Sequence, residues 1–167
     1  MSSLLARLAA LVSGGGRGSR AARTGSARQG LWGEREAEKF LLGRDTEDAR
    51  VKVRVLGRRV KVGRDEIDLV LEERDARGRE IVFVEVKTRS SELFGGGRAA
   101  MDRRKRHALC RAVARYMRRL PPTPFRIDLV EVYGRADSGA PPRIEHQRAA
   151  VPMELRYAAP ALARRRI

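Results

Sequence analysis

The order of apolar and polar positions predicts two paired strands at the centre of the fold. Residues 81–87 form a near-continuous apolar run of β-branched and aromatic side chains, which is typical of a strand covered on both faces. A second strand-like run carries Asp68 among isoleucine, leucine and valine. The polar segment 73–79 between the runs is typical of a hairpin connection, with Gly78 available for a positive φ angle. Folding these strands against each other can bring Asp68 next to Glu85.

Helical periodicity and strand alternation predict the elements around this pair. Before it lie a helix over residues 33–42 that ends near Gly43, a strand over residues 51–55, a turn at 57–58 and a further alternating run from 60 onward. After it lie a basic helix over 99–120 that stops before two prolines, a strand over 125–132 and a short edge strand over 144–147. This order predicts an α/β sandwich around a mixed sheet.

The chain divides into one folded segment and two basic extensions. Its 167 residues are enough for a single domain with a buried core. Residues 1–28 are expected to be a disordered basic extension, and residues 29–148 carry the predicted elements. Residues 149–167 are expected to form an irregular basic tail.

Composition favours a polyanionic partner. The formal net charge is +16, and lysines and arginines in such excess neutralise phosphates and release counterions. A basic proteome rich in arginine and alanine is the alternative explanation. Charge alone does not separate DNA from RNA, or binding from cleavage.

Cysteine content and hydropathy limit the class of protein. The single cysteine, Cys110, excludes an internal disulfide framework and a cysteine-rich zinc site, and its helical surroundings favour a buried thiol. No apolar stretch of the sequence reaches the roughly 18 residues that cross a membrane. Because Arg7 interrupts the short apolar start, a secretory signal is not expected. We expect a cytoplasmic protein without membrane contact, with an arginine-rich organelle transit peptide as the alternative.

The charges at the end of the 81–87 run indicate a site. Glu85 and Lys87 project from the same face of the strand, roughly 6–7 Å apart. Burying a carboxylate and an ammonium there is costly unless they are paired or hold a metal. With Asp68 they offer two carboxylates and a lysine, which fits a Mg²⁺ site that acts on phosphate. A structural ion pair between neighbouring strands is the alternative.

With these residues in this order, the chain resembles a PD-(D/E)xK nuclease domain. More closely, it resembles the YraN-like (UPF0102) family of predicted endonucleases, which is related to archaeal Holliday junction resolvases. An isolated E-x-K is a weak signal, whereas the full set in this order is specific. The resemblance departs at Asp65, where related sequences usually have glycine. It covers about residues 29–148, and the matching stretches are 33–34 with Ala37 and Leu41, 66–70, 82–89, Lys105, 112–116 and 125–130.

The resemblance implies a restriction-endonuclease-like three-layer sandwich, with a central mixed sheet flanked by helices. It also implies that Asp68 and Glu85 coordinate Mg²⁺ or Mn²⁺, with the Val86 carbonyl as a further ligand. Lys87 would orient or help deprotonate the attacking water and stabilise charge at the phosphate. Glu34 would lie beside the site and help hold a metal.

Glu34 also has a simpler interpretation. An acid in the first turn of a helix is stabilised by the helix dipole, without any role in a site. Glu36 is its local competitor for the metal-binding role.

Two interpretations of the function stay open. The first is a metal-dependent endonuclease that acts on DNA rather than RNA, including branched or structured DNA. The second is a nucleic-acid-binding protein on a nuclease scaffold that no longer cuts, and a partner-binding adaptor that uses the basic tails is a weaker third. Related resolvases act as dimers, so the resemblance raises a homodimer, although no interface is recognisable in the sequence. Residues predicted to contact nucleic acid, unless they merely form a solvated helix face, are Arg89, Arg98, Arg103, Arg104 and Lys105.

Overall fold

The two apolar runs that predict paired strands lie in the middle of one five-stranded sheet. The computed structural model describes residues 17–47, 50–90 and 101–157. β3 and β4 are parallel, and the other neighbouring pairs are antiparallel. The strands follow one another across the sheet in chain order: β1 (Lys52–Val62), β2 (Asp65–Asp75), β3 (Gly78–Arg89), β4 (Phe125–Tyr133) and β5 (Arg143–Gln147).

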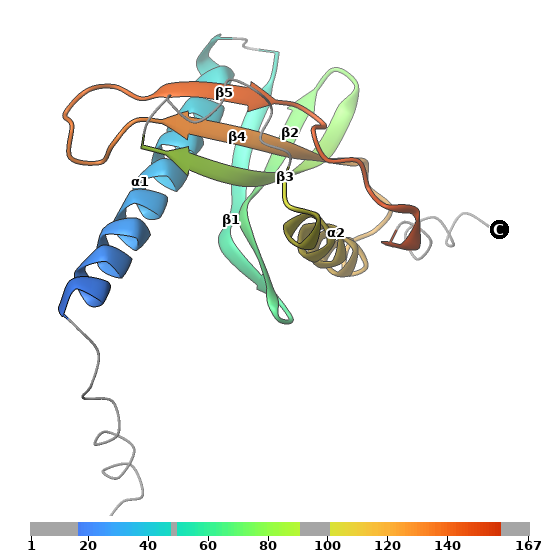
Figure 1. Ribbon diagram of the computed structural model, residues 1–167. Coiled ribbons are helices and arrows are strands. Elements are labelled where there is room, and N and C mark those ends of the chain that lie inside the picture. Colours follow the sequence, from blue (N-terminus) through green and yellow to red (C-terminus); the bar gives the residue numbers. More distant parts are fainter. Residues whose placement is uncertain (1–16, 48–49, 91–100, 158–167) are drawn as a thin grey trace, which may run out of the picture.

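Two helices cover the sheet from opposite faces. α1 (Arg17–Glu47) packs against one face, and α2 (Arg103–Met117), which connects the parallel strands β3 and β4, packs against the other (Figure 1). The result is an α/β sandwich of three layers with a central mixed sheet, as predicted for a restriction-endonuclease-like fold.

Strand β3 contributes to the core on both faces because its side chains alternate. Phe83 packs with Leu109 of α2, whereas Val84 packs with Ala37 and Leu41 of α1. All five of these side chains are buried. Burial of a large apolar side chain stabilises a fold by roughly 1.5–3 kcal/mol. The near-continuous apolar run therefore reflects a strand enclosed by two layers.

The β2–β3 hairpin forms where the sequence predicts it. Its turn lies at residues 76–77, and Gly78 has a φ of +120°, as expected for the glycine of this connection. The Arg77 backbone N–H donates to Asp75 Oδ1 at 2.8 Å. Such a side-chain contact stabilises a tight turn.

β1 is one continuous strand rather than two short ones, so the turn predicted at residues 57–58 is wrong. β1 pairs with β2 on both sides of a register shift between Val55 and Gly57. A bulge of this kind bends a strand without ending it. A Cβ at Gly57 would lie 2.6 Å from a methyl of Val60. The chain reverses later, at a two-residue turn that begins with Gly63 at φ +66°.

α1 is longer than the helix predicted over residues 33–42. Residues 17–28 are helical where the sequence analysis expects disorder, and residues 1–16 lie outside the described part of the chain. Alanine and arginine are strong helix formers, and they outweigh the helix-weakening glycines in this segment.

Gln29 ties α1 to the connection between β4 and β5. Its Nε2 donates to the Gly134 carbonyl at 2.7 Å, and its Oε1 accepts from the Ala136 N–H at 3.0 Å. Both ends of one amide are therefore used, which fixes the N-terminal part of α1 against the rest of the protein.

α2 is shorter than the predicted helix over residues 99–120, of which residues 99–100 lie outside the described chain. The helix begins after Asp102, whose side chain accepts a hydrogen bond from the Arg104 N–H at 3.2 Å. From Arg119 onward, backbone hydrogen bonds span three residues rather than four, so the chain tightens before the prolines.

The C-terminal strands agree with the prediction to within one residue at each end. Cys110 is buried in α2, also as predicted. Residues 149–154 are irregular, and residues 158–167 of the predicted tail lie outside the described residues. Among the helices that the structure describes, none is both long enough and apolar enough to cross a membrane.

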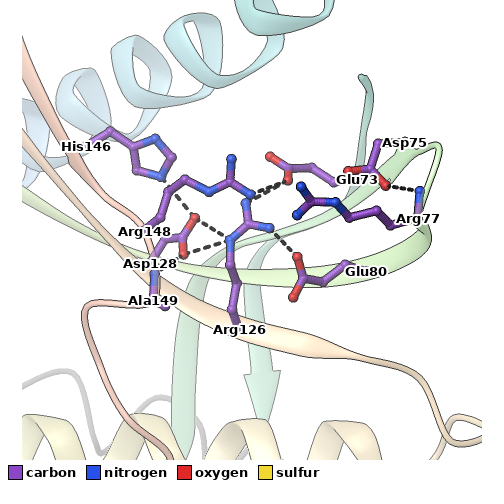
Figure 2. A network of polar contacts seen from close by, with 9 residues as sticks. All are labelled: Glu73, Asp75, Arg77, Glu80, Arg126, Asp128, His146, Arg148 and Ala149. Atoms are coloured by element: carbon purple, nitrogen blue, oxygen red, sulfur yellow. Dashed lines mark hydrogen bonds and ion pairs between the residues drawn. The ribbon is translucent and has the colours of Figure 1, made fainter. Parts of the chain in front are cut away.

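A buried network of charges joins β2, β3 and β4 on the α1 side of the sheet (Figure 2). Arg126 of β4, with 8% of its side chain exposed, contacts three acids. Its Nη2 lies 2.8 Å from Glu73 Oε2, its Nε lies 3.0 Å from Asp128 Oδ1, and its Nη1 donates to Glu80. One arginine thus compensates carboxylates from three strands.

Asp128 is fully satisfied within this network. Besides Arg126, it contacts His146 Nε2 at 2.9 Å and accepts from the Ala149 N–H at 2.8 Å (Figure 2). Its arginine partner is a near neighbour on the same strand. The network lies around the beginning of β3, five residues or roughly 17 Å along the strand from Glu85.

Candidate functional site

Asp68 and Glu85 lie on adjacent strands at the point where the β2–β3 ladder ends. The last paired residues are Leu69 and Val84, and the two acids are the next residue on each strand. In place of a ladder bond, the Val86 backbone N–H donates to Asp68 Oδ2 at 2.8 Å. The structure therefore brings together the two acids that the sequence analysis selects.

The Glu85 carboxylate is buried between two lysines. Its side chain is 1% exposed, whereas those of Lys87 and Lys105 are 37% and 38% exposed. Lys87 Nζ donates to Glu85 Oε1 at 2.8 Å. Lys105 Nζ lies 3.2 Å from Oε2 but is not aligned as a hydrogen bond, and no other described residue hydrogen-bonds to Oε2. Oε2 is thus held by an ion pair without an aligned hydrogen bond, which another cation could replace.

Asp68 lies in an environment that disfavours its charge. Burial, and next the neighbouring charge of Glu85, raise the pKa of Asp68 to about 6, against opposing contributions from the Val86 N–H and Lys105. Two carboxylates that share a partly dry space disfavour each other's ionisation. A divalent cation between them would reverse this effect.

Glu34 reaches the same site from α1. Burial raises the pKa of Glu34, and the charges of Asp68 and Glu85 are close enough to interact with it. Its Oε1 lies 3.3 Å from Arg59 Nη1. The competing Glu36 instead makes an exposed ion pair within α1. Of these two acids, only Glu34 belongs to the site.

Gly33 allows α1 to approach β3 closely. A Cβ at Gly33 would lie 2.9 Å from the Cβ of Thr88 and closer still to its hydroxyl. Helix and strand therefore meet at a position without a side chain. Because Glu34 is the next residue, this contact determines how far its carboxylate enters the site.

The residues predicted to contact nucleic acid differ in their surroundings. Arg103 and Arg104 are exposed in the first turn of α2. Arg89 is held in an ion pair with an acid of β4 at 3.0 Å. Lys105 contacts the buried acid of the site rather than lying on a free helix face. Arg98 lies outside the described residues.

Arg59 is a site residue that the sequence analysis misses. Its guanidinium lies 3.3 Å from Glu34 and 3.1 Å from Glu66, so it bridges α1 and β2. Arg59 follows the bulge in β1 and has a φ of +47°. Nothing in the charge pattern distinguishes it from Arg58, which pairs with Glu38.

Asp65, where the resemblance departs from its usual glycine, binds α2. Its two carboxylate oxygens accept hydrogen bonds from Arg111 at 2.7 and 2.8 Å. This fork-shaped contact is strong and directional, and the hydrogen bond with Arg111 lowers the pKa of Asp65. The departure therefore fastens the β1–β2 hairpin to α2 and leaves Asp68 in place.

The carboxylates of Asp68 and Glu85 fit a divalent metal ion that keeps part of its water shell better than an ion bound only by protein ligands. Among the residues that the structure describes, no three acidic, histidine or cysteine side chains are gathered as metal ligands. Mg²⁺, however, commonly binds through one or two carboxylates and keeps several waters. Asp68 and Glu85 supply two such carboxylates, and the Glu85 oxygen without a hydrogen bond matches an ion held there.

The part of the chain that is similar to known proteins includes this site. A family model described as "Uncharacterised protein family UPF0102" matches residues 33–132, which include all four predicted catalytic residues. A UPF0102 protein of Verminephrobacter eiseniae is 48% identical over 71 residues, which cover 42% of this chain and 47% of the relative. A UPF0102 protein of Symbiobacterium thermophilum is 36% identical over 109 residues, which cover 64% and 83%. The chain thus spans about half the length of the Verminephrobacter protein.

Proposed function

The chain belongs to the uncharacterised protein family UPF0102, and we propose that it is a metal-dependent endonuclease that hydrolyses phosphodiester bonds in DNA. The observation that carries this proposal is the buried Glu85 carboxylate, which has one oxygen without a hydrogen bond from the described residues and lies beside Asp68. Both oxygens contact lysine ammonium groups, at 2.8 and 3.2 Å, but a purely structural ion pair would not need a second acid whose charge is disfavoured. Perturbed carboxyls of this kind cluster at functional sites.

Asp68 and Glu85 would hold Mg²⁺ or Mn²⁺, with the Val86 carbonyl as a further ligand. Such an ion, when bound, activates a water and compensates charge at the phosphate. Because the pKa of Asp68 is about 6, this carboxyl takes up a proton as the pH falls through that value. Metal affinity should therefore weaken below about pH 6.

The remaining side chains act on water and phosphate. The hydrogen bond to Glu85 fixes the Lys87 ammonium beside that carboxylate, where it can orient the attacking water and stabilise charge on a phosphate oxygen. Glu34 is held by Arg59 at the edge of the site and can accept a hydrogen bond from a water there. Positions fixed by ion pairs need little reorganisation during the reaction.

The charge distribution supports a DNA substrate. The net charge of +16 and the exposed Arg103 and Arg104 favour contact with a phosphate backbone. On the α1 face of the sheet, a cavity of about 450 Å³ is lined by Thr88, Arg28 and Arg135, among others, and its two arginines also favour an anionic partner. We place the activity in the cytoplasm, and a homodimer would present two such sites to branched DNA.

Cleavage assays on labelled DNA test this proposal. Wild-type protein with Mn²⁺ or Mg²⁺ should cut at least one of duplex, single-stranded, flap and four-way substrates, and EDTA should stop the reaction. Glu85→Gln and Asp68→Asn should abolish cleavage while largely keeping DNA binding. Glu145→Gln, at an exposed ion pair on β5, is the matched control and should cut normally. Cleavage that survives Glu85→Gln would refute the assignment.

A second candidate is a nucleic-acid-binding protein that no longer cuts. It is favoured by the lysines that already compensate Glu85, and by the lack of a preformed three-ligand group among the described residues. This candidate predicts DNA binding that is strongly salt-dependent but indifferent to metal and to Glu85→Gln. Calorimetric titration with Mn²⁺ separates the two, because only the nuclease should bind the ion and lose it in Glu85→Gln.

A further inference from the structure

Glu85 is compensated by two lysines from different elements, and only one of them belongs to the strand motif. Lys87 follows on β3 and hydrogen-bonds to Oε1 at 2.8 Å. Lys105 comes from the first turn of α2 and lies 3.2 Å from Oε2 without hydrogen-bond alignment. One carboxylate therefore has a tightly bound and a loosely bound cation.

Lys105 is charged and partly exposed to solvent. Burial lowers the pKa of Lys105, but attraction to Glu85 and Asp68 outweighs burial, so the pKa is raised overall. Its side chain is still 38% exposed. A flexible four-carbon stem allows the ammonium to leave by rotation about single bonds. The adjacent Arg103 and Arg104 are exposed, so a short outward movement brings Lys105 to a basic surface.

We propose that Lys105 is a resident cation that occupies Glu85 Oε2 while the protein is free of metal, and that metal binding moves its ammonium outward onto a phosphate of the nucleic acid. This inference rests on the proposed metal site. A divalent ion and an ammonium at the same oxygen repel each other strongly at such short range. The two occupants therefore exclude each other, whereas Lys87 on the other oxygen stays.

The exchange has two consequences. The buried Glu85 carboxylate keeps a counter-charge at every stage, which avoids the large penalty of an uncompensated buried charge. The freed Lys105 adds a phosphate contact only after the metal is in place, so metal and DNA should bind cooperatively. Lys105 is thus a positioning residue in the metal-free protein and a substrate contact in the loaded one.

Metal titration without DNA gives the first test. Lys105→Gln removes the competing charge, so the variant should bind Mn²⁺ roughly tenfold more tightly than wild type near pH 7.5. Arg104→Gln is the matched control, because it removes an equal charge from the exposed neighbouring position. Its Mn²⁺ affinity should stay within about twofold of wild type, because exposed charges are screened. Lys105→Arg keeps the charge and should not bind more tightly than wild type.

The salt dependence of DNA binding gives the second test. With Mn²⁺ and a DNA duplex carrying non-hydrolysable linkages, Lys105→Gln should reduce the slope of log affinity against log salt by about one unit. In EDTA the slope should equal that of wild type, because Lys105 is then engaged with Glu85.

The outcomes separate this inference from the proposed function. If wild type binds Mn²⁺ and Lys105→Gln binds it equally or more weakly, the exchange is overturned and the metal site stands. A failure of wild type to bind Mn²⁺ would overturn both. Circular dichroism melts of each variant establish that the compared proteins are folded.

Discussion

Replacing Asp68 with asparagine should stabilise the metal-free protein at neutral pH. Burial and repulsion from Glu85 raise the pKa of Asp68 from 3.8 to about 6. Each pH unit of such a shift corresponds to about 1.4 kcal/mol. Ionisation of Asp68 therefore lowers the free energy of unfolding by up to about 3 kcal/mol relative to a neutral side chain. Asparagine has nearly the same size and stays neutral, so the variant should regain this free energy.

The pH dependence of this effect follows from proton linkage. Since the pKa is higher in the folded protein than in the unfolded chain, the folded state binds the proton more tightly between about pH 4 and pH 6. This contribution to stability is fully present below about pH 4 and is lost as the pH rises through about 6. Asparagine does not titrate. The difference between variant and wild type should thus grow from near zero at pH 4 to its full size at pH 7.5.

Urea unfolding followed by circular dichroism measures the effect, with EDTA present and the pH set near 4, 5, 6 and 7.5. Asp137→Asn is a control in which the change in stability should have the opposite sign, because the hydrogen bond from exposed Arg135 lowers the pKa of Asp137. Millimolar Mg²⁺ should then stabilise wild type, since a ligand of the folded state shifts unfolding, but should not stabilise Asp68→Asn.

A raised pKa of Asp68 is refuted if Asp68→Asn is no more stable than wild type at pH 7.5 in EDTA. A gain of equal size at pH 4 would also refute it, because a protonated carboxyl and an amide should then be nearly equivalent. Either result would mean that the surroundings of Asp68 do not disfavour its negative charge.

Two further substitutions test how the fold holds the site. Gly33→Ala should lower both the melting temperature and the Mn²⁺ affinity, because a methyl would press α1 away from β3. Gly30→Ala has open space around the new methyl and should stabilise α1 by about 1 kcal/mol, so equal behaviour of the two variants would contradict the close-approach argument. Arg126→Met should lower the free energy of urea unfolding by about 3–5 kcal/mol, because it leaves buried acids without their shared partner. Arg135→Met breaks only an exposed ion pair and should change stability little, and a similarly small loss in Arg126→Met would show that the network is not structural.

Local hydrophobic patterns predict those helices and strands whose burial is the same along their whole length. β3 and β4 are enclosed by a layer on each face, so their apolar runs give both their existence and their ends to within a few residues. The hairpin glycine Gly78 is equally readable, because a positive φ angle is a local requirement.

Predictions from the sequence are wrong where contacts between distant parts of the chain determine the local structure. The glycine at position 57 marks a bulge rather than a turn, because β2 continues to pair on both sides of it. The first helix extends back to Arg17, and Gln29 in this extension is bonded to a loop more than a hundred residues later. Neither contact leaves a trace in the local sequence.

The same division runs through the candidate site. The sequence by itself placed Asp68 and Glu85 on two strands joined by a hairpin, with Lys87 on the same face as Glu85, because strand alternation is a local periodicity. The register that sets the two acids side by side came from the structure. Only the tertiary structure decided that Lys105 of α2 lies at Glu85, and that Arg59 joins Glu34 to the site. Those contacts depend on how helices lie across the sheet, and packing of distant elements, rather than periodicity, fixes that arrangement.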